Sequence, residues 1–250
     1  MSRHAVMIRL AALIMLLAFI SAPNLFAPVF EPLTTNNAPA IYNQGNLLFL
    51  TMAHLGTVFS AALASALVAV LLGVLVTRPF GVEFLPLSRS LVSIGQTFPP
   101  VAVLAIAVPL VGFGEKPTLI ALFLYGLLPI FENTLTGLTQ VSPLTLDAAK
   151  GMGMGPARRL YEVELPLALP VILAGIRLSV VINLGTATIG STVAAKGLGE
   201  VIIAGLQSNN TAFILQGGFV VALLAVLIHD GLMMFERLLV RRLGLGAAAA

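Results

Sequence analysis

The sequence contains no cysteine and no tryptophan, and only 9% of its 250 residues are charged. Without cysteine the chain has no disulfide framework, no thiolate ligand for a metal and no thiol nucleophile. The three histidines, His4, His54 and His229, are far apart and make no metal-ligand spacing. The chain has no long polar region, which excludes an ATPase or a large soluble domain on it. The net charge is only +3, and we expect no nucleic-acid partner.

The chain is instead rich in apolar sequence, with 58% hydrophobic residues and a mean hydropathy of +1.04. This composition is typical of a membrane protein. A length of 250 residues leaves room for about six spanning helices of about 20 residues each. The sequence therefore predicts an all-α fold, a polytopic bundle of membrane helices. The apolar runs fall at 10–30, 51–76, 92–112, 117–140, 169–194 and 214–235.

The first apolar run has two interpretations. Arg3 and Arg9 followed by a short apolar core resemble a cleaved signal peptide. We favour an uncleaved signal anchor, because the apolar character continues through Leu25–Phe30 and five more spans follow. Residues 1–46 are then an N-terminal anchor helix with an external loop.

The positions of the basic residues predict the topology. If the N-terminus lies inside, only Lys116 and Lys196 of the 13 basic residues lie outside. Cytoplasmic segments of membrane proteins carry an excess of lysine and arginine. We therefore expect both termini, and the segment 147–166, to face the cytoplasm.

The segment 147–166, DAAKGMGMGPARRLYEVELP, is charged where most of the chain is apolar. Its glycines allow a sharp turn, and Pro156 suits the first turn of a short helix that we expect through Ala157–Glu162. Leu165 and Pro166 would close this element before the next span. The segment lacks the G-K-[ST] of a phosphate-binding loop, so we expect no nucleotide site. It is either an ordinary polar loop or a docking surface, and we favour docking.

Three places in the spans are candidates for a solute path. Pro99-Pro100 breaks any helix there, and Gln96 and Thr97 lie beside the break, although a simple helix start is the alternative. An acidic residue within a span suggests function, but Glu132, followed by Asn133, is also placed to reach the interface or to pair with an arginine. In the fifth span polar residues recur with helical spacing, among them Asn183 and Thr186, and helix packing is their alternative role.

The spacing D-A-A-x3-Gly153-x9-Val163-x-Leu165-Pro166 resembles the cytoplasmic loop signature E-A-A-x3-G-x9-I-x-L-P of bacterial ABC importer permeases. The departures are Asp for Glu and Val for Ile. The resemblance implies a MetI-like permease core over 47–238, followed by a cytoplasmic tail over 239–250. It also implies that the segment holds a helix that couples the permease to an ATPase. The coupling residues would be Asp147, Ala148, Ala149, Gly153, Arg158, Arg159, Leu165 and Pro166.

From about Leu47 to Glu236 the chain resembles permeases of osmoprotectant importers, which carry glycine betaine, choline and related compounds. This resemblance implies a non-catalytic subunit in the bacterial inner membrane with no cofactor of its own, since ATP binds to the partner. The implied partners are a cytoplasmic ABC ATPase dimer, a second permease subunit (identical or different) and a periplasmic or lipid-anchored solute-binding protein. Other solutes, such as an amino acid or a sulfonate, and an ion-coupled carrier are the alternatives. Three tyrosines and no tryptophan offer no aromatic cage for a quaternary ammonium group.

Overall fold

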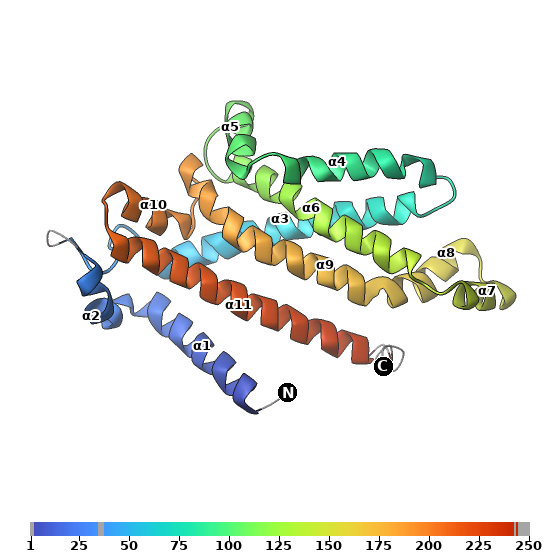
Figure 1. The fold of residues 1–250 in the computed structure, drawn as a ribbon, viewed down its shortest axis with the longest axis horizontal. Helices are drawn as coiled ribbons and strands as arrows, with labels where there is room; N and C mark the ends of the chain where they lie inside the picture. The colour runs from blue at the N-terminus through green and yellow to red at the C-terminus, as the bar shows by residue number, and fades with distance from the viewer. Residues whose placement is uncertain (1–2, 35–37, 243, 245–250) are drawn as a thin grey trace. The chain divides into compact units, whose positions relative to one another are not determined.

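The computed structural model describes residues 3–34, 38–242 and 244, and the regular secondary structure of this part of the chain is entirely helical (Figure 1). The all-α fold predicted from the sequence is confirmed. The longer helices are α1 (Arg3–Ser21), α3 (Leu47–Val76), α4 (Leu85–Thr97), α5 (Pro100–Val111), α6 (Glu115–Thr139), α9 (Leu165–Thr186) and α11 (Thr211–Arg242). The shorter ones are α2 (Ala27–Phe30), α7 (Pro143–Gly151), α8 (Pro156–Arg159) and α10 (Gly199–Gln207).

Each of the six predicted apolar runs coincides with a helix or with a bent pair of helices. Within the described residues, four helices are long and apolar enough to cross a membrane: α3, α6, α11 and the helix that contains α9. Two bent pairs, Val6–Ser21 with Pro23–Leu33 and Val82–Thr97 with Pro100–Val111, raise this number to six. Of the predicted tail, residues 239–242 continue α11, whereas 243 and 245–250 lie outside the described residues.

The first predicted span is not one straight helix. α1 ends at Ser21, and the chain bends by 110° before the helical stretch that begins at Pro23. Ala22 between them leaves the helical region, with φ −138° and ψ 61°. Proline disfavours the α conformation in the residue before it and offers no N–H, so Pro23 explains the break.

The predicted break at Pro99-Pro100 is confirmed. α4 ends at Thr97, and α5 begins at Pro100. Pro99 precedes α5 with an extended backbone, at φ −59° and ψ 142°. Pro100 then occupies the first helical position. A backbone N–H at this position has no acceptor within the helix, so a proline, which lacks the N–H, costs no helical hydrogen bond there.

The chain divides into two compact units. Unit 1 comprises Met1–Ala61, Phe98–Leu122 and Val181–His229, and unit 2 comprises the rest. In unit 1 a buried cluster forms around Phe19 and Leu198. The fully buried Gln216 of α11 accepts the backbone N–H of Tyr42 (3.1 Å) and donates to the carbonyl of Ala40 (2.7 Å). These two hydrogen bonds hold the loop before α3 against α11.

Unit 2 is held together by large buried side chains and by close helix approaches at glycines. Phe131 of α6 is fully buried in its core. A Cβ at Gly175 of α9 would lie 2.6 Å from the Cβ of Asn133 and 2.8 Å from the carbonyl oxygen of Pro129. Small residues let membrane helices approach to backbone contact. Gly175 therefore fixes α9 directly against α6.

The short helix that begins at Pro156 does not end at Glu162, as the sequence suggested. A π-helical turn over Leu160–Glu164 joins α8 to α9 without a break. Leu165 and Pro166 thus lie inside a continuous helix rather than closing an element. Pro166 lacks an N–H, and its ring crowds the carbonyl four residues earlier, that of Glu162. Since that carbonyl belongs to the wider π turn, we infer that the turn accommodates the proline.

Candidate functional site

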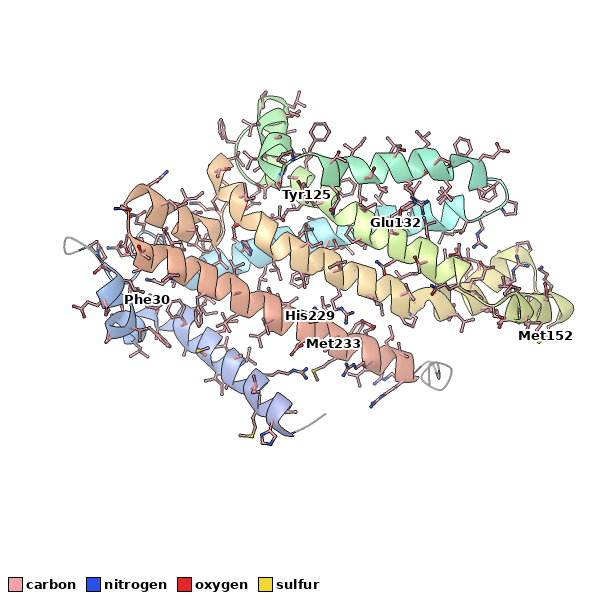
Figure 2. The ribbon with its side chains drawn as sticks, in the orientation of Figure 1. Phe30, Tyr125, Glu132, Met152, His229 and Met233 are labelled. Carbon is pink, nitrogen blue, oxygen red and sulfur yellow. The ribbon has the colours of Figure 1, made fainter. Side chains whose placement is uncertain are left out.

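The charged segment 147–166 begins in the short helix α7, turns, and continues through the short helix α8; we call residues 143–164 the α7–α8 segment. Met152 lies at its outer end (Figure 2). On α7 the side chains of Asp147 and Ala148 are exposed, whereas Ala149 is buried. Ala149 therefore packs inside unit 2, and the small side chain of Ala148 leaves room for another surface to approach.

The turn after α7 requires glycine at one position. Gly153 has φ +78°, in the left-handed region that glycine adopts without steric cost. The N–H of Gly153 donates to Lys150 O (2.9 Å) and that of Met154 to Ala149 O (3.1 Å), the two bonds of a Schellman motif. A Cβ at Gly153 would meet no atom of the described residues within 4 Å. The backbone angle, not lack of space, is thus the reason for this glycine.

Large apolar side chains are exposed on the α7–α8 segment beside its charges. Leu144 is 82% exposed, Met152 68% and Tyr161 70%. Exposed apolar groups ringed by polar ones mark interaction surfaces. This arrangement favours docking of a partner over an ordinary polar loop.

Glu164 anchors the end of the α7–α8 segment through two arginines. Its carboxylate accepts a hydrogen bond from Arg78 Nη2 at 2.6 Å and another from Arg159 Nε at 3.0 Å. Arg78 follows α3 in the chain, and Arg159 ends α8. The side chain of Glu164 is 6% exposed, so solvent screens these ion pairs little. We call Glu164, Arg78 and Arg159 the ion triad.

A polar cleft of about 440 Å³ lies beside the ion triad, all of it within unit 2. The charged side chains of Asp147 and Lys150, which are 2.9 Å apart, form another part of its wall. The cleft therefore separates α7 from the chain that follows α3. The full lining is Thr77, Arg78, Pro79, Leu138, Thr139, Val141, Pro143, Leu146, Asp147, Lys150, Arg159 and Glu164.

Helix α4 has three distinct faces, each with i, i+4, i+7 spacing. Ser88, Val92 and Gly95 are buried against the rest of unit 2. Leu87, Leu91 and Ile94 are exposed and apolar. The third face is polar and consists of Arg89, Ser93 and Gln96. A helix patterned in this way lies between protein, an apolar medium and a polar one.

Two polar contacts join the polar face of α4 to α6, which runs alongside it (Figure 1). Arg89 binds Glu132 through both oxygens, with Nε–Oε1 at 2.7 Å and Nη2–Oε2 at 3.0 Å. Gln96 Nε2 donates to the carbonyl of Tyr125 at 3.1 Å. Tyr125, Glu132 and the exposed Thr136 share one side of α6, seven and four residues apart. We call these residues and the polar face of α4 the α4–α6 polar surface.

The other residues predicted for a path lie elsewhere. Thr97 is exposed at the end of α4 and donates to Ile94 O. Asn133 donates to Pro129 O at 2.7 Å and lies where α6 meets α9.

In unit 1 Asn183 is fully buried and donates to Leu122 O at 3.1 Å. Its Oδ1 has no hydrogen-bond partner in the described part of the chain. Thr186 donates to the carbonyl four residues earlier. These environments are those of helix packing, and a place in the path stays a prediction for Asn133, Asn183 and Thr186.

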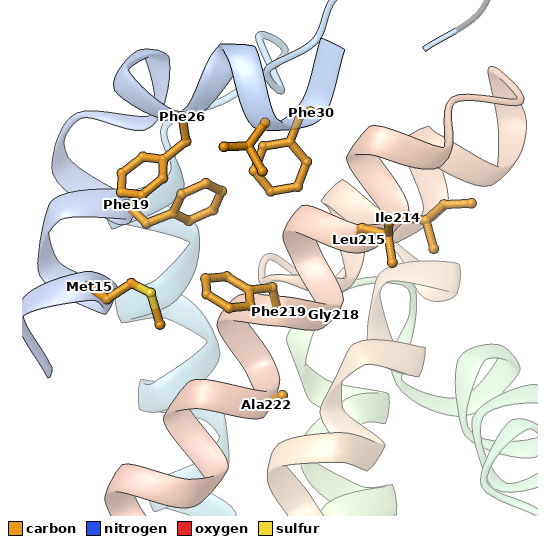
Figure 3. Close-up of a pocket in the computed structure, with 10 residues that line it drawn as sticks. Met15, Phe19, Phe26, Phe30, Ile214, Leu215, Gly218, Phe219 and Ala222 are labelled. Carbon is orange, nitrogen blue, oxygen red and sulfur yellow. The ribbon is translucent and has the colours of Figure 1, made fainter. Parts of the chain in front are cut away.

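An apolar cavity of about 780 Å³ opens in unit 1, lined by residues of α1, α2, the turn between them and α11 (Figure 3). Four phenylalanines contribute to it, Phe19, Phe26, Phe30 and Phe219, an aromatic cluster that the number of tyrosines and tryptophans in the sequence does not predict. The ring of Phe19 lies 5.1 to 5.7 Å from the other three. None of the described residues that line the cavity is charged, so a cation there would lose its hydration without gaining a counter-charge from them.

Two parts of the site were not recognised from the sequence. The polar face of α4 could have been predicted, because Arg89, Ser93 and Gln96 recur at helical spacing in the sequence. The ion triad has no such signal, because Arg78 and Glu164 are 86 residues apart.

Apolar spanning helices, a protruding polar segment with exposed apolar anchors and a polar surface on two spans define a membrane-transport subunit. A family model described as "Binding-protein-dependent transport system inner membrane component" matches residues 69–244. The chain belongs to this family, as its coupling-loop signature predicted. It is therefore a transport permease and not an enzyme.

Named relatives support the same branch of the family. The chain is 41% identical over 201 residues to the choline transport system permease protein OpuBB of Bacillus subtilis, covering 78% of this chain and 89% of that protein. It is 39% identical over 194 residues to the osmoprotectant import permease protein OsmY of Salmonella typhimurium, covering 78% and 82%. Among solved structures, the inward-facing MetNI methionine ABC transporter matches with a TM-score of 0.69 at 20% identity, covering 77% of this chain and 95% of that chain. This last match establishes the MetI-like fold.

Proposed function

We propose that this chain is the permease subunit of an ATP-driven importer of osmoprotectants such as glycine betaine or choline. It would lie in the bacterial inner membrane, with both termini in the cytoplasm. The partners would be an ABC ATPase dimer that binds the ATP, a second permease subunit, and a periplasmic or lipid-anchored solute-binding protein. This chain itself would hold no cofactor. The relatives at about 40% identity support the solute class.

The observation that carries the ATP-driven mechanism is the α7–α8 segment. Its exposed Leu144, Met152 and Tyr161 offer apolar anchors to a partner, and its continuous junction with α9 transmits displacement to a spanning helix. A rigid segment attached to a membrane helix converts closure of an ATPase into reorientation of the span. The coupling residues would be Asp147, Ala148, Ala149, Gly153, Arg158 and Arg159, with Leu165 and Pro166 in the helix that continues from them.

The solute path would run along the α4–α6 polar surface. Charged side chains within membrane spans face protein or a water-filled cavity, because hydrocarbon does not solvate them. Arg89 and Glu132 lie on candidate spans, and their side chains are 53% and 37% exposed in the single subunit. The apolar face of α4 would meet lipid or the second permease. Of the predicted path residues, Gln96 and Glu132 lie on this surface, and a place in the path stays a prediction for Thr97.

Reconstitution in liposomes tests the function. The complete importer, with its ATPase and binding protein, should accumulate glycine betaine or choline only when ATP is supplied. Uptake driven by an ion gradient through this chain alone would instead identify a secondary carrier. Uptake of an amino acid or a sulfonate in place of both osmoprotectants would assign the other solute class.

Thiol labelling tests the path, because the native chain has no cysteine. A Ser93→Cys variant places a thiol on the polar face of α4, and a Leu91→Cys variant places one on its exposed apolar face. In the assembled importer a hydrophilic thiol reagent should modify the cysteine at 93 at least about tenfold faster than the one at 91. Equal rates would contradict the assignment of the polar surface to the path.

A further inference from the structure

The Arg89–Glu132 ion pair joins two candidate spans, and both of its side chains are exposed in the single subunit. The Glu132 carboxylate accepts hydrogen bonds from two nitrogens of the Arg89 guanidinium group, from Nε at 2.7 Å and from Nη2 at 3.0 Å. The pairs Arg78–Glu164 and Arg177–Glu236 differ, since no side chain in them is more than 21% exposed. In a water-filled path an exposed ion pair contributes little to stability, because water competes for both partners. The Arg89–Glu132 pair can therefore open without disrupting the packing of α4 on α6.

Its two charges match a solute that carries both signs. A guanidinium group binds a carboxylate through two parallel hydrogen bonds, as Arg89 binds Glu132. The freed Glu132 carboxylate would attract an ammonium group. Tyr125 lies on the same side of α6, two turns before Glu132 (Figure 2). We propose that this pair is a transient binding site in the path for zwitterions that carry a carboxylate and a quaternary ammonium group.

In this site the solute carboxylate replaces Glu132 on Arg89, and the solute ammonium replaces Arg89 at Glu132. Each protein charge exchanges one partner for another, so none is left uncompensated. A simple cation would compensate Glu132 but leave Arg89 unpaired beside it, and specificity arises from such unpaired charges. The pair would thus favour betaines over choline. This inference rests on the proposed function and adds to it a binding site and a preference among the proposed solutes.

The experiment measures ATP-dependent uptake of glycine betaine and of choline by the reconstituted importer at saturating binding protein. Arg89→Gln removes the carboxylate partner and leaves Glu132. It should lower uptake of glycine betaine about tenfold or more relative to uptake of choline. Glu132→Gln removes the ammonium partner and should lower uptake of both solutes. Glu83→Gln removes an exposed charge just before α4 and is the matched control, with both rates unchanged.

An unchanged ratio of glycine betaine to choline uptake in Arg89→Gln would overturn the proposal, because a purely structural pair affects both solutes equally. If Arg89→Gln does not assemble into the importer, Arg89→Lys is measured instead, because it keeps the positive charge and loses only the two parallel hydrogen bonds of the guanidinium group. An unchanged ratio of glycine betaine to choline uptake in that variant would likewise overturn the proposal. Transport of choline alone by the unaltered importer would also exclude a zwitterion site. Transport of neither solute would refute the proposed function itself, and the assignment of the pair with it.

Discussion

Replacing Glu164 with glutamine removes the charge that holds Arg78 and Arg159 at the end of the α7–α8 segment. The three side chains are 6%, 16% and 20% exposed. Removing one partner of a buried ion pair costs about 3–5 kcal/mol, because the remaining charge stays buried and uncompensated. Glutamine keeps the volume and one hydrogen-bond acceptor, so we expect a loss near the lower end, about 3 kcal/mol.

Chymotrypsin cleavage after Tyr161 measures this loss locally. Tyr161 is 70% exposed but lies in the π-helical turn, so cleavage requires the helix to open. When reclosing is faster than cleavage, the cleavage rate follows the population of the open form. About 3 kcal/mol then corresponds to a rate roughly 100-fold higher in Glu164→Gln.

Glu162→Gln is the matched control for this measurement. Its partner Arg158 is 2.9 Å away, and the two side chains are 50% and 63% exposed. An exposed pair of this kind contributes about 0.5 kcal/mol or less, so cleavage should change by roughly twofold. Cleavage of Glu164→Gln at the rate of Glu162→Gln would refute the role of the ion triad as the anchor of the segment.

Glycine substitutions give the remaining predictions. Gly153→Ala should lower the stability of the turn by about 1–2 kcal/mol, because φ is +78° there, and should raise chymotrypsin cleavage roughly 5- to 30-fold. Gly155→Ala is the control, because φ is −69° at this position, and it should change the cleavage rate little. Equal cleavage of these two variants would contradict the left-handed turn. Gly175→Ala should lower the unfolding free energy by about 1–3 kcal/mol, because its methyl group would lie 2.8 Å from the carbonyl oxygen of Pro129. Thermal unfolding of the purified complex measures this loss of stability. Gly185→Ala is the control on the same helix, since a Cβ there would meet no atom of the described residues within 4 Å. It should leave the unfolding free energy unchanged or raise it by up to about 1 kcal/mol. A loss of stability as large as that of Gly175→Ala would contradict the close contact between Gly175 and Pro129.

Features that depend on local sequence were predictable. Long apolar runs identify spans because hydrocarbon selects apolar helices whatever their neighbours are. The Pro99-Pro100 break follows from the missing N–H groups, and the turn at Gly153 follows from the need for a left-handed residue after α7. The coupling-loop signature identified the family because its spacing is local to one segment.

Most features that depend on distant partners were not predictable; the pairing of Glu132 with an arginine, one alternative from the sequence, is found with Arg89. Arg78 and Glu164 meet only after α3 and α9 have packed in unit 2. Asn133 looks equivalent to its neighbour Glu132 in the sequence, but one residue of helical rotation places it against Gly175 instead. Pro166 predicts a helix end, and the helix continues because a π turn precedes it. In each case the tertiary environment, not the residue type, decides the role.

Photo-cross-linking from Met152 most directly tests whether the α7–α8 segment is the surface that an ATPase drives. Benzoylphenylalanine placed at Met152, 68% exposed, should form an adduct with the ATPase subunit in the assembled importer. The same group at Phe113, 74% exposed but outside the segment, should form none. An importer that hydrolyses ATP yet gives no ATPase adduct from position 152, or equal adducts from both positions, would contradict the coupling role.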